Sequence, residues 1–214
     1  MTLQDIRVLA SKGEGLKIEF KKKAAHPEKI VRELIALANT SGGDLLIGVD
    51  DDGTVSGQRF IEEEIFVMEK AIQELIFPQL TYVVFLVKWN GKKGGAVFRL
   101  SLSTESPHYL KEKDRKQAFL RVADRSVQAS REVWEVLRRG KAQRDTIFTY
   151  SWKEELLMKA MQETGKITLK EYAKLAKLPK FIASKTLVRL VLANVLVIHA
   201  QEADDFFTLK ETGA

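Results

Sequence analysis

The stretch ALANTSGGDLLIGVDDDGTVSG, residues 36 to 57, decides the fold of this chain. Its first residues belong to a helix that ends at Thr40, and two glycines follow. The apolar run Leu45 to Val49 is too short for a helix and is typical of a buried strand. The Asp52-Gly53 dipeptide that follows predicts a hairpin turn, with the chain returning through Thr54 to Gly57. The stretch therefore predicts a helix packed on a sheet.

The sequence on either side extends this pattern. Leu16 to Lys21 has the composition of a short strand, and His26-Pro27 opens the helix, because proline at a first-turn position loses no hydrogen bond. The other elements that we expect here are a helix over Glu62 to Ile76, strands over Thr81 to Trp89 and Ala96 to Ser103 joined at Asn90-Gly91, a strand over Ala118 to Val122, and a helix over Arg131 to Arg139 capped by Ser130. Mixed strands and helices with hairpins predict an α+β domain, in which helices cover one mixed sheet.

A second domain is expected after the charged segment Gly140 to Asp145, which lacks apolar periodicity. Ser151 with Glu154, and Thr168 with Glu171, have the spacing of capping boxes and predict two helix starts. A third helix over Lys180 to Ala193 precedes two short strands, Val195 to His199 and Phe206 to Leu209. This order predicts a small winged helix-turn-helix, and we place the two domains at residues 1 to 143 and 148 to 214.

Composition excludes several classes of protein. With 45% hydrophobic and 30% charged residues, the 214-residue chain has the profile of a globular protein. It has no apolar run long enough for a membrane span. It has no cysteine, which excludes disulfides, zinc–thiolate sites and thiol catalysis. The first residues are charged where a signal peptide needs an apolar core, so we expect a cytoplasmic protein.

The net charge of +6 is unevenly distributed. Lys88 to Arg144 holds 15 basic and 6 acidic residues, Lys166 to Arg189 holds 7 and 1, and Asp44 to Glu74 holds 2 and 9. Blocks of one sign create fields that favour an anionic partner such as nucleic acid. The alternative is that the lysine-rich faces serve only solubility.

Three carboxylates are candidates for a metal site. Glu14 and Glu19 lie before and on the first strand, and Asp51 lies at the end of a strand that could be its neighbour. Carboxylates that converge on one end of a sheet would bind Mg²⁺ or Mn²⁺, which can activate water against a phosphodiester. Lys21 shares the face of Glu19 and could neutralise a phosphate. The alternative is that Asp50-Asp51-Asp52 is ordinary turn chemistry.

The third helix of the second domain is the candidate DNA-reading element. Its polar side carries Lys180, Ser184, Lys185 and Arg189, the residue types that contact phosphates and base edges when such a helix enters the major groove. Against this, the expected wing carries acidic residues that would repel phosphates: Glu202, Asp204 and Asp205. Winged helices also serve as protein–protein modules.

The motifs EGLKIEFKKK, residues 14 to 23, and residues 36 to 57 together resemble the Schlafen-type Alba-like domain, also called a divergent AAA or DNA-binding domain. The shared pattern is Glu, then Glu-Phe-Lys, a helix, Ala-x-Ala-Asn-x-x-Gly-Gly, an apolar strand and Gly-Val-Asp-Asp. Residues 106 to 130 resemble the family's later segment more weakly, and Arg121 and Arg125 in it are candidate nucleic-acid contacts. A P-loop is missing, which excludes an ATPase of that type.

The resemblance has two functional implications. In vertebrate Schlafens, a carboxylate trio of this pattern cleaves transfer and ribosomal RNA, and its positions fall on Glu14, Glu19 and Asp51. Bacterial members that pair the domain with a winged helix are regarded as transcriptional regulators. This chain lacks the cysteines of the nucleases' zinc site and has one domain copy where they have two. We therefore expect a nucleic-acid-binding protein, with DNA favoured over RNA and no certain cofactor. The alternatives are a metal-dependent endoribonuclease and an oligomeric assembly adaptor.

We also expect a homodimer or a larger oligomer. A single helix-turn-helix reads one half-site, and two-fold dimers are the commonest soluble assemblies. The run Val83 to Val87 lacks strict alternation. This predicts a strand that is buried on both faces, by helices or by a second chain.

Overall fold

A computed structural model describes residues 1–214 except 90, 92, 106, 113–114, 141–149 and 212–214. Its contacts divide the chain into two compact units, Met1–Gln128 and Ala129–Ala214. The division comes before helix α4 (Arg131–Arg139), whereas the sequence places it after this helix, in a segment that lies outside the described residues. Within the described part of the chain, no helix combines the length and the apolar character needed to cross a membrane.

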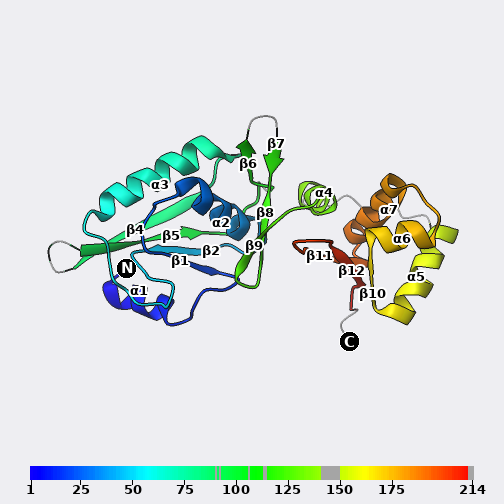
Figure 1. Ribbon diagram of the computed structural model, residues 1–214, viewed down its shortest axis with the longest axis horizontal. Helices are drawn as coiled ribbons and strands as arrows, with labels where there is room; N and C mark the ends of the chain where they lie inside the picture. Colours follow the sequence, from blue (N-terminus) through cyan, green and yellow to red (C-terminus); the bar gives the residue numbers. More distant parts are fainter. Residues whose placement is uncertain (90, 92, 106, 113–114, 141–149, 212–214) are drawn as a thin grey trace. The chain divides into compact units, whose positions relative to one another are not determined.

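The N-terminal unit is built on a four-stranded mixed sheet (Figure 1). Its strands lie in the order β1 (Ile18–Lys21), β2 (Gly43–Ile47), β5 (Lys93–Leu100) and β4 (Tyr82–Trp89). β1 and β2 are parallel, and the other pairs are antiparallel. The predicted mixed α+β class is confirmed, and so is the β4–β5 hairpin.

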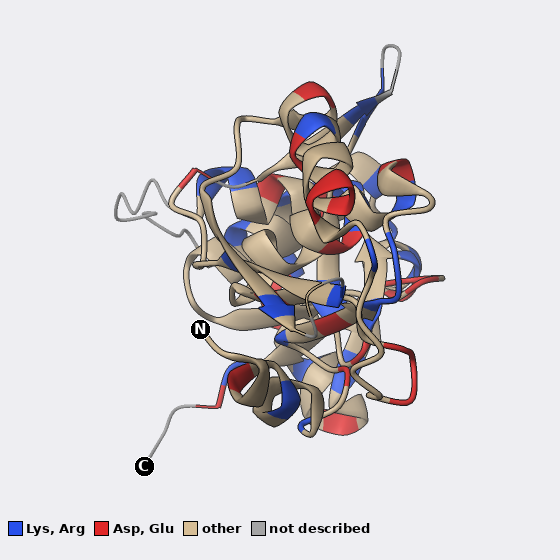
Figure 2. Ribbon diagram, turned by 90° about the vertical axis from the view of Figure 1, so that its left-hand side faces the viewer, with Lys and Arg blue, Asp and Glu red and all other residues tan. Residues whose placement is uncertain are grey.

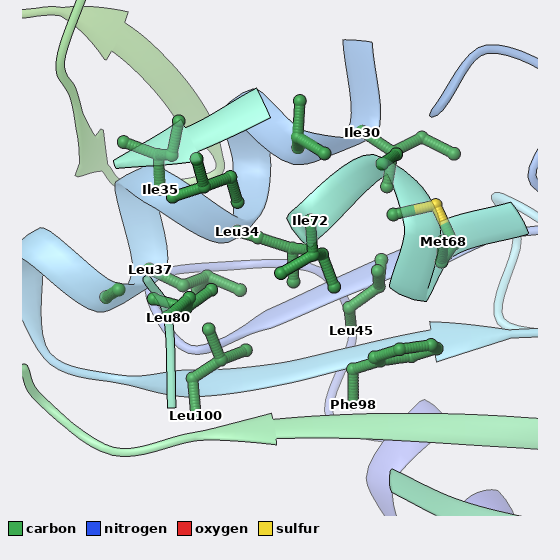
Figure 3. Packing of buried hydrophobic residues seen from close by; sticks show 14 of the residues in the cluster. Ile30, Leu34, Ile35, Leu37, Leu45, Met68, Ile72, Leu80, Phe98 and Leu100 are labelled. Carbon is green, nitrogen blue, oxygen red and sulfur yellow. The ribbon is translucent and has the colours of Figure 1, made fainter. Parts of the chain in front are cut away.

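Helices cover both faces of this sheet. α2 (Pro27–Thr40) and α3 (Ile61–Leu75) pack on one face, and α1 (Leu3–Ala10) packs on the other. The larger core lies between the sheet, α2 and α3 (Figure 3). Figure 3 labels ten of its buried members: Ile30, Leu34, Ile35, Leu37, Leu45, Met68, Ile72, Leu80, Phe98 and Leu100. α1 was not predicted, because its eight residues begin at Leu3, where only the Thr2 capping box marks a helix.

The Gly42-Gly43 step explains how α2 turns into β2 within two residues. Both glycines have positive φ, +70° and +154°. A Cβ at Gly42 would lie 2.5 Å from the carbonyl oxygen of Leu100, and one at Gly43 would lie 2.4 Å from that of Lys17. Only glycine fits at either position, because backbone atoms on two sides leave no room for a side chain.

The predicted turn at Asp52-Gly53 is present, with Gly53 N donating to Asp50 O at 2.8 Å. The chain does return through Thr54 to Gly57, with Asp50 N donating to Thr54 O at 2.9 Å and Gly57 N donating to Gly48 O at 2.8 Å, but the return is not a regular strand. β2 pairs with β1 on one side and with β5 on the other. Since both edges of β2 are occupied, the backbone of the returning segment bonds to the residues that follow β2, at Gly48 and Asp50.

Several short strands extend the N-terminal unit beyond the sheet. β3 (Ile76–Phe77), β6 (Tyr109–Glu112) and β7 (Arg115–Gln117) form one group, and β8 (Phe119–Val122) pairs with β9 (Arg125–Gln128). Of these, only β8 was predicted.

The side chain of Asn39, in the Asn-x-x-Gly-Gly motif of α2, connects the helix to these strands through hydrogen bonds. Its Nδ2 donates to the carbonyl oxygens of His108, at 2.9 Å, and Phe119, at 3.1 Å. Its Oδ1 accepts from His108 N at 2.8 Å. The buried amide therefore holds two distant segments against α2.

The C-terminal unit consists of helices and a three-stranded antiparallel sheet of order β10-β12-β11. After α4, its elements are α5 (Trp152–Thr164), β10 (Lys166–Thr168), α6 (Leu169–Leu175), α7 (Lys180–Leu192), β11 (Leu196–His199) and β12 (Phe206–Leu209). Both predicted capping boxes are present. The β11–β12 pair is also as predicted, whereas β10 was not. This order of elements is compatible with the winged helix-turn-helix prediction.

Candidate nucleic-acid interface

Arg121 lies at the centre of a buried network rather than on a binding surface. Its side chain is 1% exposed. Nη2 contacts Glu19 Oε2 at 2.5 Å, Nη1 contacts Glu33 Oε2 at 2.7 Å, and Nε donates to Gly15 O at 2.9 Å. The predicted nucleic-acid contact by Arg121 is therefore wrong, because no side-chain atom of it is available to a phosphate.

The same network neutralises Glu19. Its carboxylate is paired with both Arg121 and Lys21. Burial raises the pKa of the neighbouring Glu33, and the nearby negative charge of Glu19 raises it further, while a hydrogen bond from the Ser126 hydroxyl acts in the opposite direction. The two most buried charges, Arg121 and Glu19, are thus paired with each other, as buried charges require, and the half-buried Lys21 and Glu33 complete the network.

The three predicted metal ligands are not brought together. Glu14 Oε1 accepts a hydrogen bond from Phe20 N at 2.8 Å, and Asp51 is exposed in the turn after β2. Among the described residues, no group of three or more His, Asp or Glu side chains could hold a metal ion. Because Glu19 already accepts from two cationic side chains, the donor set does not fit the Mg²⁺ or Mn²⁺ that the resemblance implies.

These residues instead close the outer edge of strand β1. Phe20 N is satisfied by Glu14, and Phe20 O accepts from Lys21 Nζ at 2.8 Å. Ile18 O accepts from Gly15 N at 3.0 Å and from Arg121 Nη2 at 3.4 Å. Two of the catalytic candidates, Glu14 and Lys21, therefore bond to outward backbone groups of β1, together with Gly15 and Arg121.

Sequence reasoning missed Glu33 and Ser126, although a signal for the network existed. The strand Phe119–Val122 alternates between buried and half-buried positions, and Arg121 occupies an inward one beside buried Phe119. A charged residue at an inward position needs a buried partner. Glu33, between the buried Val31 and Leu34 of α2, was the candidate for that partner.

Basic residues of α7 form the exposed surface that the sequence predicts. Lys180 and Lys185 are exposed, and Arg189 is half-buried. In the described part of the C-terminal unit, the ion pairs involve Arg138, Arg139, Lys153, Lys159 and Lys170, but none of these three residues. Their positive charges are therefore available to an external anion.

The surface of α7 is a stripe bounded by α4. Phe181, Lys185 and Arg189 recur every four residues and so follow one line along the helix. Phe181 is 63% exposed. Ser184, predicted to face nucleic acid, instead donates its hydroxyl hydrogen bond to Glu132 of α4. Its predicted contact requires that this bond be broken.

The acidic wing residues are partly engaged inside the unit. Asp204 Oδ2 pairs with Lys170 Nζ at 2.8 Å. Asp205 Oδ1 accepts from Gln201 N at 3.0 Å. These contacts reduce the repulsion that the wing would exert on a phosphate backbone, because Lys170 neutralises one of its charges.

The β6–β7 hairpin is a second basic surface, in the N-terminal unit. Lys111, Arg115 and Lys116 are exposed, and Lys111 lies directly opposite Lys116 in the ladder. In Figure 2 this hairpin appears as blue strands below a grey tip. Arg125, the other predicted contact of this unit, is exposed at the start of β9.

Two of the solved structures that resemble this chain have low sequence identity to it. One is the DIP2311 protein from Corynebacterium diphtheriae, with 19% identity and a TM-score of 0.46 over 90% of this chain and 36% of that one. The other is the N-terminal domain of a protein from Nitrosomonas europaea described as related to the ATP-dependent DNA helicase RecG. It has 22% identity and a TM-score of 0.42 over 58% of this chain and 92% of that one. This chain spans about a third of the Corynebacterium protein.

Comparisons of sequence are more informative. No curated protein matches this chain. A family model described as Schlafen, AlbA_2 matches residues 14–130, which is more than half of the chain. The match begins at Glu14 and includes the Asn39 motif and the whole Arg121 network. The chain therefore belongs to the Schlafen AlbA_2 family.

Proposed function

We propose that this protein binds nucleic acid, and that its C-terminal unit contacts duplex DNA as part of a transcriptional regulator. The observation that carries the proposal is the α7 stripe, in which Lys185 and Arg189 lie on one line of an exposed helix face without a carboxylate partner among the described residues. Membership of the Schlafen AlbA_2 family supports association with nucleic acid in general.

The geometry around α7 suits a phosphate backbone. α6 and α7 are joined by a short turn in which Lys177 has a φ of +51°, and Lys174, Lys177 and Lys180 are exposed on or beside this turn. In a helix that enters the major groove, the N-terminal residues contact base edges, while cationic side chains beside the groove contact phosphates. Lys185 and Arg189, further along the helix, are placed for phosphate contacts.

The two alternatives have weaker support. A metal-dependent endoribonuclease needs converging carboxylates, and Glu19 is instead paired with Arg121 and Lys21. An assembly adaptor could use the exposed ring of Phe181. A hydrophobic contact of that kind would be insensitive to salt, whereas phosphate contacts release counterions and weaken steeply as salt increases.

Fluorescence anisotropy with a labelled DNA duplex at several salt concentrations tests the proposal. We expect a linear log–log salt dependence for the unchanged protein. The double variant Lys185→Ala/Arg189→Ala should flatten its slope by roughly 1 to 2 units, one for each lost phosphate contact. The control is Lys159→Ala, because Lys159 lies on α5 and pairs with Glu155 at 2.8 Å.

Two results would contradict the proposal. An unchanged slope in the double variant would remove α7 from the contact surface. Cleavage of transfer RNA in the presence of Mn²⁺, lost in Asp51→Ala but retained in the α7 variant, would favour the nuclease instead. Asp51 suits this control because it is exposed, so that its replacement should leave the fold intact.

A further inference from the structure

Strand β4 forms an open edge of the N-terminal sheet. It is the last strand in the order β1-β2-β5-β4, and among the described residues it pairs only with β5 (Figure 1). The run Val83 to Val87 was predicted to be buried on both faces by helices or by a second chain, and within one chain the helices do not bury all of it. Val83 is 54% exposed and Leu86 is 43% exposed. β4 therefore presents both apolar side chains and unpaired backbone groups to its surroundings.

The opposite edge of the same sheet is closed. β1 has four residues, and its outward backbone groups bond to Glu14, Lys21, Arg121 and Gly15. β4 has eight residues. The sheet is thus blocked at one end and extendable at the other.

The composition of β4 lacks the usual protection of an edge strand. In monomeric proteins, charged residues, prolines, bulges or a short strand prevent an exposed edge from pairing with another chain. β4 contains no proline, and its single charged residue, Lys88, pairs with Glu62 of α3. A long apolar edge of this kind is a template for pairing with another strand.

We propose that β4 pairs antiparallel with β4 of a second copy of this chain, so that two four-stranded sheets become one continuous sheet. A two-fold axis perpendicular to the sheet places each face of one copy beside the same face of the other. Because side chains alternate between faces along a strand, directly opposite residues then have numbers that differ by an even number. An axis at Phe85 places Phe85 opposite itself, Val84 opposite Leu86, and Val83 opposite Val87.

This register makes the strand complementary to itself. It pairs apolar residues on both faces and sets Lys88 opposite Tyr82, so that no like charges meet. Moving the axis to Leu86 would set Lys88 opposite Val84 and leave Tyr82 without a partner. Because both β1 edges stay closed, the extended sheet has no further free edge and association stops at the dimer.

Cysteine scanning tests the register directly, because the chain has no cysteine of its own. Directly opposite residues in an antiparallel pair have Cα atoms about 4.5–5.5 Å apart, a separation that a disulfide can bridge. We expect Phe85→Cys to form a covalent dimer under mild oxidation. Val84→Cys and Leu86→Cys should each stay uncrosslinked alone and should crosslink when the two variants are mixed. Crosslinking of Leu86→Cys alone would overturn the register.

Light scattering tests the assembly without any change to Phe85, whose ring packs partly against the core. The unchanged protein should have about twice its chain mass of 24.3 kDa at micromolar concentration. Val83→Lys should reduce the mass to that of one chain. The control Phe66→Lys, at a 67% exposed position of α3, should remain a dimer. A single-chain mass at all concentrations, species larger than a dimer, or a dimer that Val83→Lys does not weaken would each overturn the proposal.

Discussion

The charged residues around Arg121 and those along α7 are of the same chemical types but are placed in opposite ways. Arg121 pairs with Glu19 and Glu33, and Lys21 pairs with Glu19, so each charge has a partner within the fold. On α7, no described carboxylate pairs with Lys185. Buried charges must be paired to be tolerated, whereas exposed ones cost little when unpaired. The first group is therefore suited to holding the fold, and the second to binding an anion.

This difference changes the meaning of the family motif. Glu14, Glu19 and Lys21 were chosen as catalytic candidates, but their contacts close strand β1 and anchor the β8–β9 hairpin. A loss of activity in a Glu19 variant would consequently have two explanations, a missing functional group or an unfolded domain. Stability measurements are needed to separate them.

The largest expected effect is on stability, from Arg121→Ala. The change leaves the buried Glu19 and the half-buried Glu33 without their shared cationic partner, and removal of one partner of a buried pair typically costs about 3–5 kcal/mol. We expect this loss in the free energy of unfolding, measured by urea denaturation followed by circular dichroism.

The matched control is Arg125→Ala, an exposed arginine of the same hairpin. Its effect should stay within about 0.5 kcal/mol, as for most surface substitutions. Equal losses in both variants would show that the hairpin, and not the buried network, determines stability.

Much of the fold was accessible from the sequence because the signals were local. The local signals are the apolar periodicity of α2 and α3, the capping boxes Ser151–Glu154 and Thr168–Glu171, and the dipeptide Asn90-Gly91, of which residue 90 lies outside the described part of the chain. Such patterns depend on neighbours in the chain, so the helix starts and the β4–β5 hairpin were placed correctly.

The site was less accessible because its contacts are remote. Arg121 and Glu19 are 102 positions apart, and no spacing rule connects them. The turn at Asp52-Gly53 was recognised, but β1 and β5 occupy both edges of β2, so the backbone of the returning segment bonds to the residues beyond β2 and forms no regular strand. β6, β7 and β10 have only three or four residues each, too few for a periodic pattern.

A smaller effect is expected in the pH dependence of stability. In the folded protein, burial and the charge of Glu19 raise the pKa of Glu33 above its unfolded value. The stabilisation from Glu33 is therefore complete below the unfolded pKa, about 4.3, and is lost as the pH rises through the raised folded value. Relative to the unchanged protein, Glu33→Gln should become more stable as the pH increases from 4 to 7.

Urea denaturation at several pH values measures this difference. Glu63→Gln, at an exposed position in the first turn of α3, serves as the control and should show no such trend. A stability difference for Glu33→Gln that does not change with pH would mean that Glu33 titrates alike in the folded and unfolded states. The buried network would then hold its charges more loosely than the contacts indicate.

The smallest expected effect concerns Glu132 of α4, a carboxylate that bonds to a residue of α7 as Glu19 and Glu33 bond to Arg121. Its carboxylate accepts the Ser184 hydrogen bond and puts a negative charge on the flank of α7. Val133 of α4 and Val188 of α7 are both buried, so the two helices should stay packed when Glu132 is replaced.

Glu132→Ala should raise the affinity for duplex DNA about two- to fivefold, or roughly 0.4–1 kcal/mol, by removing repulsion and freeing Ser184. Glu163→Ala removes the same charge from exposed α5 and should change the affinity less. An equal gain in both variants would reduce the effect to net charge, whereas a gain lost in Glu132→Ala/Ser184→Ala would assign it to the hydroxyl of Ser184.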